Sequence, residues 1–121
     1  MDFKKYLTTD VIPFWLNHAI DEECGGIFND LDEDGTVYGT RKQVWFQGRA
    51  LYILCRTYRE LKKDPRYLEA AKKIFAFLPK CGTPDGRLFF LATRDGKEIM
   101  TAPDFFSETF AAIGCTEYYL V

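Results

Sequence analysis

Several features that mark common classes of binding site are missing from this 121-residue sequence. It has no phosphate-binding glycine loop of the P-loop or dinucleotide type, no nucleophile elbow and no H-E-x-x-H zinc motif. Its 16 basic residues nearly balance its 18 acidic ones, so no positive excess points to a nucleic acid or an anionic membrane as partner. No apolar run approaches the ~20 residues of a membrane span, and the start lacks the apolar core of a signal peptide. We therefore expect a cytoplasmic protein.

The sequence also lacks the spacing of a metal site or a disulfide framework. Its four cysteines are far apart, with no C-x-x-C pair and no adjacent histidine, which favours free thiols. The acidic segment 30–35 matches the first half of a calcium-binding EF-hand loop. However, the twelfth position of that loop, which should supply a bidentate glutamate, is Arg41. We therefore predict neither a metal nor a cofactor.

Apolar and aromatic residues, in contrast, are abundant. Hydrophobic residues make up 47% of the chain and charged residues 28%, which indicates a packed core in a chain long enough for one domain. Aromatic residues reach 17%. This content favours either a thick aromatic core or a site at which flat or sugar-like ligands stack.

Hydrophobic periodicity predicts a mostly helical chain with two β-hairpins. The first helix should cover residues 2–18, with a kink or break at Pro13. The hairpins should turn at 34–35 and at 95–96, because both are Asp-Gly pairs. Further helices are expected at about 42–62, from Asp64-Pro65 onward and from Pro103-Asp104 onward.

The two hairpins belong to an internal repeat, because a shift of 61 residues aligns identical residues over a hairpin and the helix after it. The matching pairs are Gly25 and Gly86, Phe28 and Phe89, Asp34 and Asp95, Gly35 and Gly96, Thr40 and Thr101, Ala50 and Ala111, and Tyr58 and Tyr119. The repeating unit is a hairpin, a buried helix and an amphipathic helix. Such units stack to cover their apolar faces, so two units should leave an open edge where a third would dock.

The helix expected at 42–62 combines an apolar stripe with a row that contains cations. The stripe is formed by Val44, Gly48, Leu51, Cys55 and Tyr58. The neighbouring row is Trp45, Arg49, Tyr52 and Arg56. So much apolar circumference predicts a helix buried on most sides, and a buried Arg49 requires an anionic or carbonyl-like partner. That partner is either a carboxylate of the protein, in a structural ion pair, or the oxygen of a substrate held over aromatic rings.

Several segments resemble one family in order and spacing. Residues 14–18, 25–28 and 31–35 resemble the opening of N-acylglucosamine 2-epimerases, residues 44–49 (V-W-F-Q-G-R) resemble their V-W-x-Q-G-R signature, and residues 106–112 resemble their F-S-D-C-F-A-A. The family includes cellobiose 2-epimerases and aldose–ketose isomerases. The resemblance implies an all-α fold, an (α/α)6 barrel with short β-hairpins between helix pairs and the sugar inside the inner ring. Residues 1–121 would be the N-terminal segment of this single domain, about two helix-pair repeats, with the remainder absent.

The resemblance also implies proton abstraction at C2 of an open-chain sugar, through an enediolate. Arg49 matches the family arginine that stabilises the oxyanion, and Trp45, Tyr52 and Phe106 are expected to contact the sugar. The two catalytic histidines of the family have no counterpart, and His18 should be structural, bonding the Gly25-Gly26 turn. We therefore expect the segment alone to be inactive, with the full-length protein an isomerase.

The alternative is a non-catalytic helical module that binds a sugar or a protein through its aromatic face. The last helix reaches Val121 without a glycine cap, which leads us to expect that the natural chain continues. The expected partners are a small sugar and either the remaining helices of the barrel or a second copy of the chain. The sequence leaves open which sugar, whether it is N-acetylated, and whether C2 is epimerised or a ketose is formed.

Overall fold

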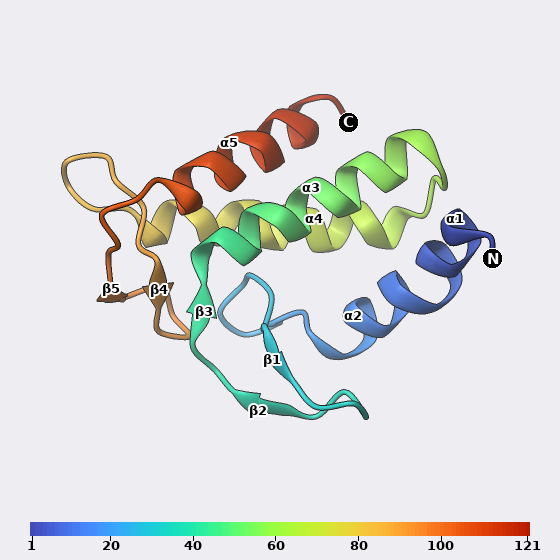
Figure 1. Cartoon of the computed structure of the whole chain (residues 1–121), viewed down its shortest axis with the longest axis horizontal. Coiled ribbons are helices and arrows are strands. Elements are labelled where there is room, and N and C mark those ends of the chain that lie inside the picture. Colours follow the sequence, from blue (N-terminus) through green and yellow to red (C-terminus); the bar gives the residue numbers. More distant parts are fainter.

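The computed structural model describes all 121 residues and is mostly helical, with short antiparallel strands (Figure 1). Its longer helices are α2 (Ile12–His18), α3 (Val44–Glu60), α4 (Pro65–Phe77) and α5 (Phe106–Tyr119). Its strands are β1 (Asp30–Leu31), β2 (Val37–Gly39), β3 (Lys42–Gln43), β4 (Leu91–Ala92) and β5 (Glu98–Met100). None of the helices is long and apolar enough to cross a membrane.

The predicted first helix is present but is built from three pieces. The short helix α1 (Phe3–Tyr6) is capped by Asp2, whose side chain accepts a hydrogen bond from the Lys5 N–H (3.1 Å). A π-helical turn (Leu7–Val11) follows, and then α2 begins, with Pro13 in its first turn. The break expected at Pro13 therefore takes the form of this π turn, and the proline lies where its missing N–H costs little.

Helices α3 and α5 lie side by side (Figure 1), and α4 packs against α3 and, through the Phe75 ring stacked on Tyr118, against α5. The helices α3 and α5 approach most closely at Gly48 and Gly114. A Cβ atom on Gly48 would lie 2.6 Å from the Ala111 nitrogen, and one on Gly114 would collide with the carbonyl oxygen of Gly48. These two glycines therefore allow backbone-to-backbone contact between the helices.

Helix α4 is amphipathic, as predicted. It begins at Pro65, and the Asp64 side chain accepts a hydrogen bond from the Arg66 N–H (3.0 Å), which caps the helix. Its buried face carries the core side chains Tyr67, Ala71 and Ile74, which are fully shielded from solvent. Its other face is exposed, so α4 covers α3 on the outside of the molecule.

The predicted helix begins at Val44 instead of near Lys42, because a short strand precedes it. Lys42 and Gln43 form β3, which pairs with β4 and extends the second hairpin to a three-stranded sheet in the order β3-β4-β5. Helix α3 then begins at Val44, whose N–H donates to the Phe90 carbonyl (3.1 Å). Backbone pairing of Lys42 and Gln43 with β4 of the second hairpin overrides the helical periodicity at this point.

Equivalent hydrogen bonds recur in the two hairpins at the shift of 61 residues. The Asp32 N–H donates to the Thr36 carbonyl and the Thr93 N–H to the Lys97 carbonyl, both at 2.8 Å. Gly35 and Gly96 have nearly the same positive φ angles, +90° and +92°. Strands β4 and β5 also lie 61 residues after β1 and β2. The repeat inferred from sequence identities is thus also a repeat of backbone structure.

Candidate functional site

The buried cation of this region is Lys42 rather than Arg49. In the apolar stripe of α3, Val44, Gly48, Leu51 and Cys55 are buried as predicted and Tyr58 is half-buried. In the neighbouring row, Trp45 and Tyr52 are half-buried, and Arg49 and Arg56 are exposed. The expectation that α3 is buried on most sides is therefore wrong for this chain. The reason is that α4 and α5 cover only the side of the stripe. Arg49 does not need an internal counter-ion.

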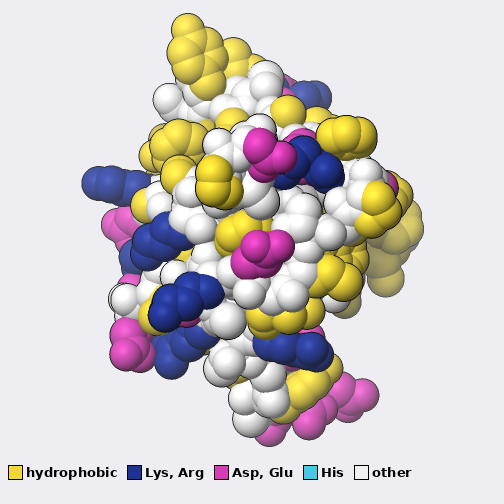
Figure 2. Space-filling view, turned by 90° about the vertical axis from the view of Figure 1, so that its left-hand side faces the viewer, with side chains coloured by type: hydrophobic (Ala, Val, Ile, Leu, Met, Phe, Trp, Pro, Cys, Tyr) yellow, Lys and Arg dark blue, Asp and Glu magenta, His cyan; other side chains and the backbone are white.

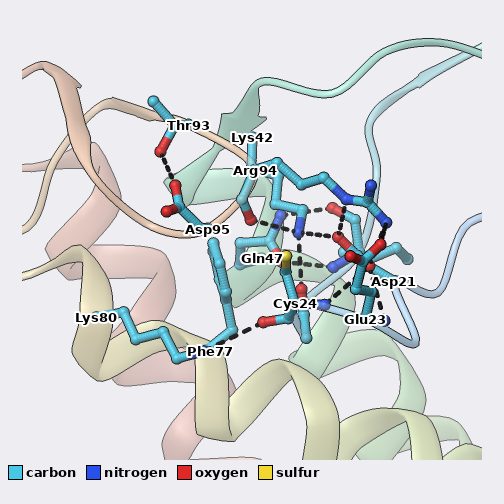
Figure 3. A network of polar contacts seen from close by, with 12 residues as sticks. Asp21, Glu23, Cys24, Lys42, Gln47, Phe77, Lys80, Thr93, Arg94 and Asp95 are labelled. Atoms are coloured by element: carbon cyan, nitrogen blue, oxygen red, sulfur yellow. Dashed lines mark hydrogen bonds and ion pairs between the residues drawn. The ribbon is translucent and has the colours of Figure 1, made fainter.

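Lys42 is fully buried and uses all three of its N–H groups (Figure 3). Its Nζ donates to Asp21 Oδ2 (2.7 Å) and to the carbonyl oxygens of Gly25 (2.7 Å) and Arg94 (2.9 Å). Nζ also lies 4.5 Å from the centre of the Phe77 ring. Burial lowers the pKa of Lys42, while the adjacent Asp21 carboxylate opposes this shift. With no donor left over, Lys42 is a structural residue.

Asp21 is the centre of this buried network. Its carboxylate accepts hydrogen bonds from the Arg94 guanidinium (2.9 and 3.0 Å) and from the N–H groups of Glu23 and Cys24 (3.0 Å each), in addition to Lys42. Burial alone would raise the pKa of Asp21, but the hydrogen bonds from Arg94 and Lys42 outweigh it and hold the pKa well below its usual range. The network joins the loop before the first hairpin to the turn of the second (Figure 3).

Arg49 lies between two aromatic rings and has no carboxylate partner. Its guanidinium carbon is 5.7 Å from the centre of the Trp45 ring and 5.4 Å from that of Phe110. None of the salt bridges or side-chain hydrogen bonds of the molecule involves Arg49. Of the two partners considered for Arg49, a carboxylate of the protein is therefore absent. Of the residues expected to contact the sugar, Trp45 lies beside the guanidinium, and the second ring there is Phe110 on α5.

An apolar groove opens beside this cation, between α1–α2 and α3. It has a volume of about 340 Å³, and Arg49 is its one charged lining residue. The ring of Trp45 borders it next to Arg49, and the rings of Trp15 and Phe46 meet within it at a centroid distance of 5.5 Å. The site therefore offers guanidinium donors at the edge of an apolar, aromatic surface.

The remaining residues predicted to contact the sugar, Tyr52 and Phe106, are not the rings against which Arg49 lies. Tyr52 is half-buried on α3, and Phe106, at the start of α5, is 57% exposed. Phe110 follows Phe106 by one helical turn, and its ring centre lies 6.1 Å from that of Trp45. Phe110 was not among the predicted contacts, although the motif at 106–112 contains it.

His18 does not bond the Gly25-Gly26 turn as expected. It is exposed at the end of α2, and its ring lies on the other turn, at Gly35, where a Cβ atom would overlap the imidazole. The ring centre is also 5.1 Å from that of Phe14. A glycine with positive φ leaves the space that the ring occupies. His18 thus packs on the Gly35 turn instead of the predicted Gly25-Gly26 turn.

Glu108 is engaged by the second hairpin rather than by Arg49. Its Oε1 accepts hydrogen bonds from Arg87 Nε (2.7 Å) and the Leu88 N–H (2.9 Å). At the equivalent position of the first repeat, Gln47 Oε1 accepts from the Ile27 N–H (2.8 Å). Burial would raise the pKa of Glu108, but the hydrogen bonds from Leu88 and Arg87 lower it overall. The carboxylate is therefore a repeat-related anchor of the hairpin backbone.

The acidic residues of the EF-hand-like segment lie away from this site. Acidic side chains gather at the lower tip of the molecule, over the β1–β2 hairpin (Figure 2). There the Asp34 carboxylate accepts a hydrogen bond from the Thr36 N–H (2.9 Å) and the Asp32 carboxylate accepts one from the Glu33 N–H (2.9 Å). Both carboxylates are used within the turn.

Known proteins resemble this chain along almost its whole length, although no family model matches it. The N-acylglucosamine 2-epimerase of Bos taurus is 38% identical over 116 residues, which are 92% of this chain and 28% of that protein. This chain belongs to the N-acylglucosamine 2-epimerase and cellobiose 2-epimerase family. The chain spans less than a third of the length of the relatives it matches.

Solved structures of this epimerase and isomerase group match the fold. The cellobiose 2-epimerase from Bacillus thermoamylovorans B4167 superposes with a TM-score of 0.82 at 26% identity, over 99% of this chain and 31% of that one. A D-mannose isomerase superposes with a TM-score of 0.85 at 18% identity, over 98% of this chain and 30% of that one. The helices and hairpins of this family chain thus match part of an α/α barrel-type structure.

Proposed function

We propose that this chain is the N-terminal segment of a sugar 2-epimerase or aldose–ketose isomerase whose domain is an (α/α)6 barrel. The reaction would be proton abstraction at C2 of an open-chain sugar, with an enediolate intermediate. The observation that carries the proposal is the state of Arg49: an unpaired guanidinium between Trp45 and Phe110 at the edge of an apolar groove. Relatives named for N-acylglucosamine, cellobiose and mannose support a sugar as the ligand.

Arg49 suits the role of oxyanion stabiliser. A guanidinium stays protonated at any physiological pH and presents up to five N–H donors in a fixed plane. Because no carboxylate of the chain occupies these donors, they are free for the sugar oxygen on which charge develops. Removing one such donor from an enzyme typically lowers kcat by ~10²–10³. The rings of Trp45 and Phe110 hold the guanidinium from two sides and offer an apolar surface for the sugar.

The chain does not supply the proton-transferring pair for this reaction. Inversion at C2 needs one base near neutral pKa on each face of the sugar. His18, the one histidine, packs on the Gly35 turn rather than in the groove. The groove contains no carboxylate, thiol or imidazole among its lining residues. The segment should therefore bind a sugar weakly without converting it to a product.

Binding can be measured through Trp45. A Trp15→Phe background leaves Trp45 as the single tryptophan. Titration with N-acetylglucosamine, mannose and cellobiose should give a saturable change in its fluorescence with at least one of these sugars. Arg49→Met should abolish the change. Arg56→Met is the matched control, because Arg56 is an exposed arginine of the same row but already pairs with Glu117 (3.2 Å). A response that survives Arg49→Met would contradict the proposed site.

Turnover can be measured in the same sample. Incubation with these sugars in D2O should produce no deuterium at C2 above the buffer control, because the base is missing. Deuterium incorporation would show that the chain contains a base that we have not recognised. This result would leave the Arg49 site intact but overturn the assignment of the bases to residues outside the chain.

The second candidate is a non-catalytic module that binds sugars, favoured by the exposure of Arg49 in this chain. The two candidates differ in the charge that they prefer. An oxyanion site should bind mannonate, whose carboxylate resembles the negative charge of the enediolate, more tightly than neutral mannose, and Arg49→Met should remove the difference. Equal affinity for the two ligands would favour the plain binding module.

A further inference from the structure

We propose that three positioning residues set the register of α5 on α3 and that this register orients the Arg49 guanidinium for its ligand. The three residues are Gly48, Gly114 and Glu117. The proposal rests on the proposed function, because it concerns the cation that would bind the ligand. An arginine side chain has many rotamers, so its plane of donors has a fixed direction only where neighbouring groups hold it. One of the two rings that hold Arg49, Phe110, comes from the other helix, so its position depends on where α5 lies along α3.

Gly48 lies against the backbone of the residue whose ring covers Arg49. A Cβ atom on Gly48 would collide with the carbonyl group of Phe110 and would lie 2.6 Å from the nitrogen of Ala111. Gly48 directly precedes Arg49 in α3, so the backbone contact and the ring contact join the same two short segments. A displacement of α5 at Gly48 is therefore also a displacement of the Phe110 ring from the guanidinium.

Gly114 makes the reciprocal contact one turn after Phe110 on α5. A Cβ atom on Gly114 would collide with the carbonyl oxygen of Gly48 and would lie 3.1 Å from the Cβ of Leu51. The two helices thus touch backbone to backbone on both sides of this point, without an intervening side chain that could adapt to a shift. The glycine pair therefore fixes how closely α5 approaches α3 beside Arg49.

Glu117 anchors α5 at a second point. Its side chain is only 8% exposed, and its carboxylate accepts hydrogen bonds from Arg56 (3.2 Å) and from Arg59 (3.0 and 3.1 Å), both on α3. Arg56 and Glu117 are 61 residues apart, as are Arg49 and Phe110. Each pair therefore joins equivalent positions of the two repeats, two helical turns apart along the helices. The ion pair and the ring contact require the same register.

A purely structural role for these residues would change stability but not the surroundings of Arg49. Those surroundings can be followed by NMR on the chain labelled with 13C-arginine, in which Arg49→Met identifies the Arg49 signals by their loss. Protons over the face of an aromatic ring resonate upfield, so the side-chain signals of Arg49 should move downfield in Phe110→Leu, which removes one ring.

Gly114→Ala should move the Arg49 signals in the same direction, because the added methyl group forces α5 away from α3. Ile74→Val is the matched control. It shortens a fully buried side chain of α4, and so lowers stability without touching the glycine contact, and it should leave the Arg49 signals unchanged.

Glu117→Gln tests the second anchor, and it decides the result if circular dichroism shows that Gly114→Ala is unfolded. The substitution keeps the size of the side chain and removes the charge that holds the two arginines. It should move the Arg49 signals downfield by less than Phe110→Leu does. Arg49 signals that stay unchanged in the folded variants would overturn the proposal.

The affinity for mannonate separates this proposal from the proposed function. Gly114→Ala should weaken binding by about 10-fold, whereas Ile74→Val should leave it unchanged. A folded Gly114→Ala chain with unaltered affinity would overturn the positioning role, while a loss of binding in Arg49→Met would still support the site. If the unmodified chain binds no mannonate, the proposed function fails, and the Arg49 signals still decide whether the register orients the guanidinium.

Discussion

Two cations close together in the sequence, Lys42 and Arg49, have opposite environments. Lys42 is completely buried, and its three N–H groups donate to Asp21, Gly25 and Arg94. Arg49 is exposed, lies against two aromatic rings and has no carboxylate partner. A cation whose donors are all occupied has no capacity left for a ligand, whereas one held only by rings keeps its donors free. The first holds the fold together, and the second is the cation that we propose for ligand binding.

Lys42→Met should cause the largest loss of stability. The substitution keeps the length of the side chain but removes one of the two cations that pair with the buried Asp21 carboxylate and leaves Arg94 as the other. Breaking a buried ion pair typically costs about 3–5 kcal/mol of unfolding free energy, and we expect a loss toward the lower end of this range because Arg94 remains. Urea denaturation measures the loss. Lys62→Met is the control. Lys62 is exposed, and its pair with Asp64 is long (3.9 Å), so it should contribute little to stability. A Lys42→Met protein as stable as the control would show that the buried network contributes nothing.

Acid should weaken the same network. Because the folded pKa of Asp21 lies below its unfolded value of 3.8, its contribution to stability is fully present above that value and is lost as the pH falls through the folded pKa. Unfolding free energy should therefore fall less steeply below pH 4 in Asp21→Asn than in the unmodified chain. Equal slopes for the two proteins would contradict the ionised state assigned to Asp21.

Gly48→Ala tests the side of α3 that is buried against α5, whereas Arg49 lies on an exposed side. The added Cβ would collide with the backbone of Phe110 and Ala111, so the helices must separate, at a cost of about 1–3 kcal/mol. The loss should appear even though alanine has about 1 kcal/mol better helix propensity than glycine. Gly82→Ala is the control, because the nearest atoms to its Cβ lie at 3.6 and 3.8 Å. Similar melting curves for both variants would refute the close α3–α5 contact.

Much of the fold could be predicted from the sequence because local signals and burial agree there. Asp-Gly pairs fixed both hairpin turns, and Asp64-Pro65 fixed the start of α4. The 61-residue shift located repeat-related hydrogen bonds made by backbone groups. Strand β3 was missed because it pairs with β4, which lies far along the chain. No local sequence pattern at Lys42 predicts this pairing.

The site was less predictable for a related reason. Periodicity identified the row that contains Arg49. It shows which residues share a face of the helix but not which face another helix covers. The apolar residues around Arg49 suggested burial, while α4 and α5 cover only the opposite stripe. Lys42 reads as an ordinary exposed charge, since its partners Asp21 and Arg94 are brought to it only by the tertiary fold. Phe110 became a neighbour of Arg49 through the same long-range packing of α5 on α3.

The most direct test is the unfolding free energy of Arg49→Met, measured in urea beside Lys42→Met. If Arg49 is reserved for a ligand, its removal should lower stability by no more than about 1 kcal/mol, the size of an exposed cation–π contact, while Lys42→Met loses several times more. A loss for Arg49→Met as large as that for Lys42→Met would show that Arg49 is a structural cation and would contradict the division of roles proposed here.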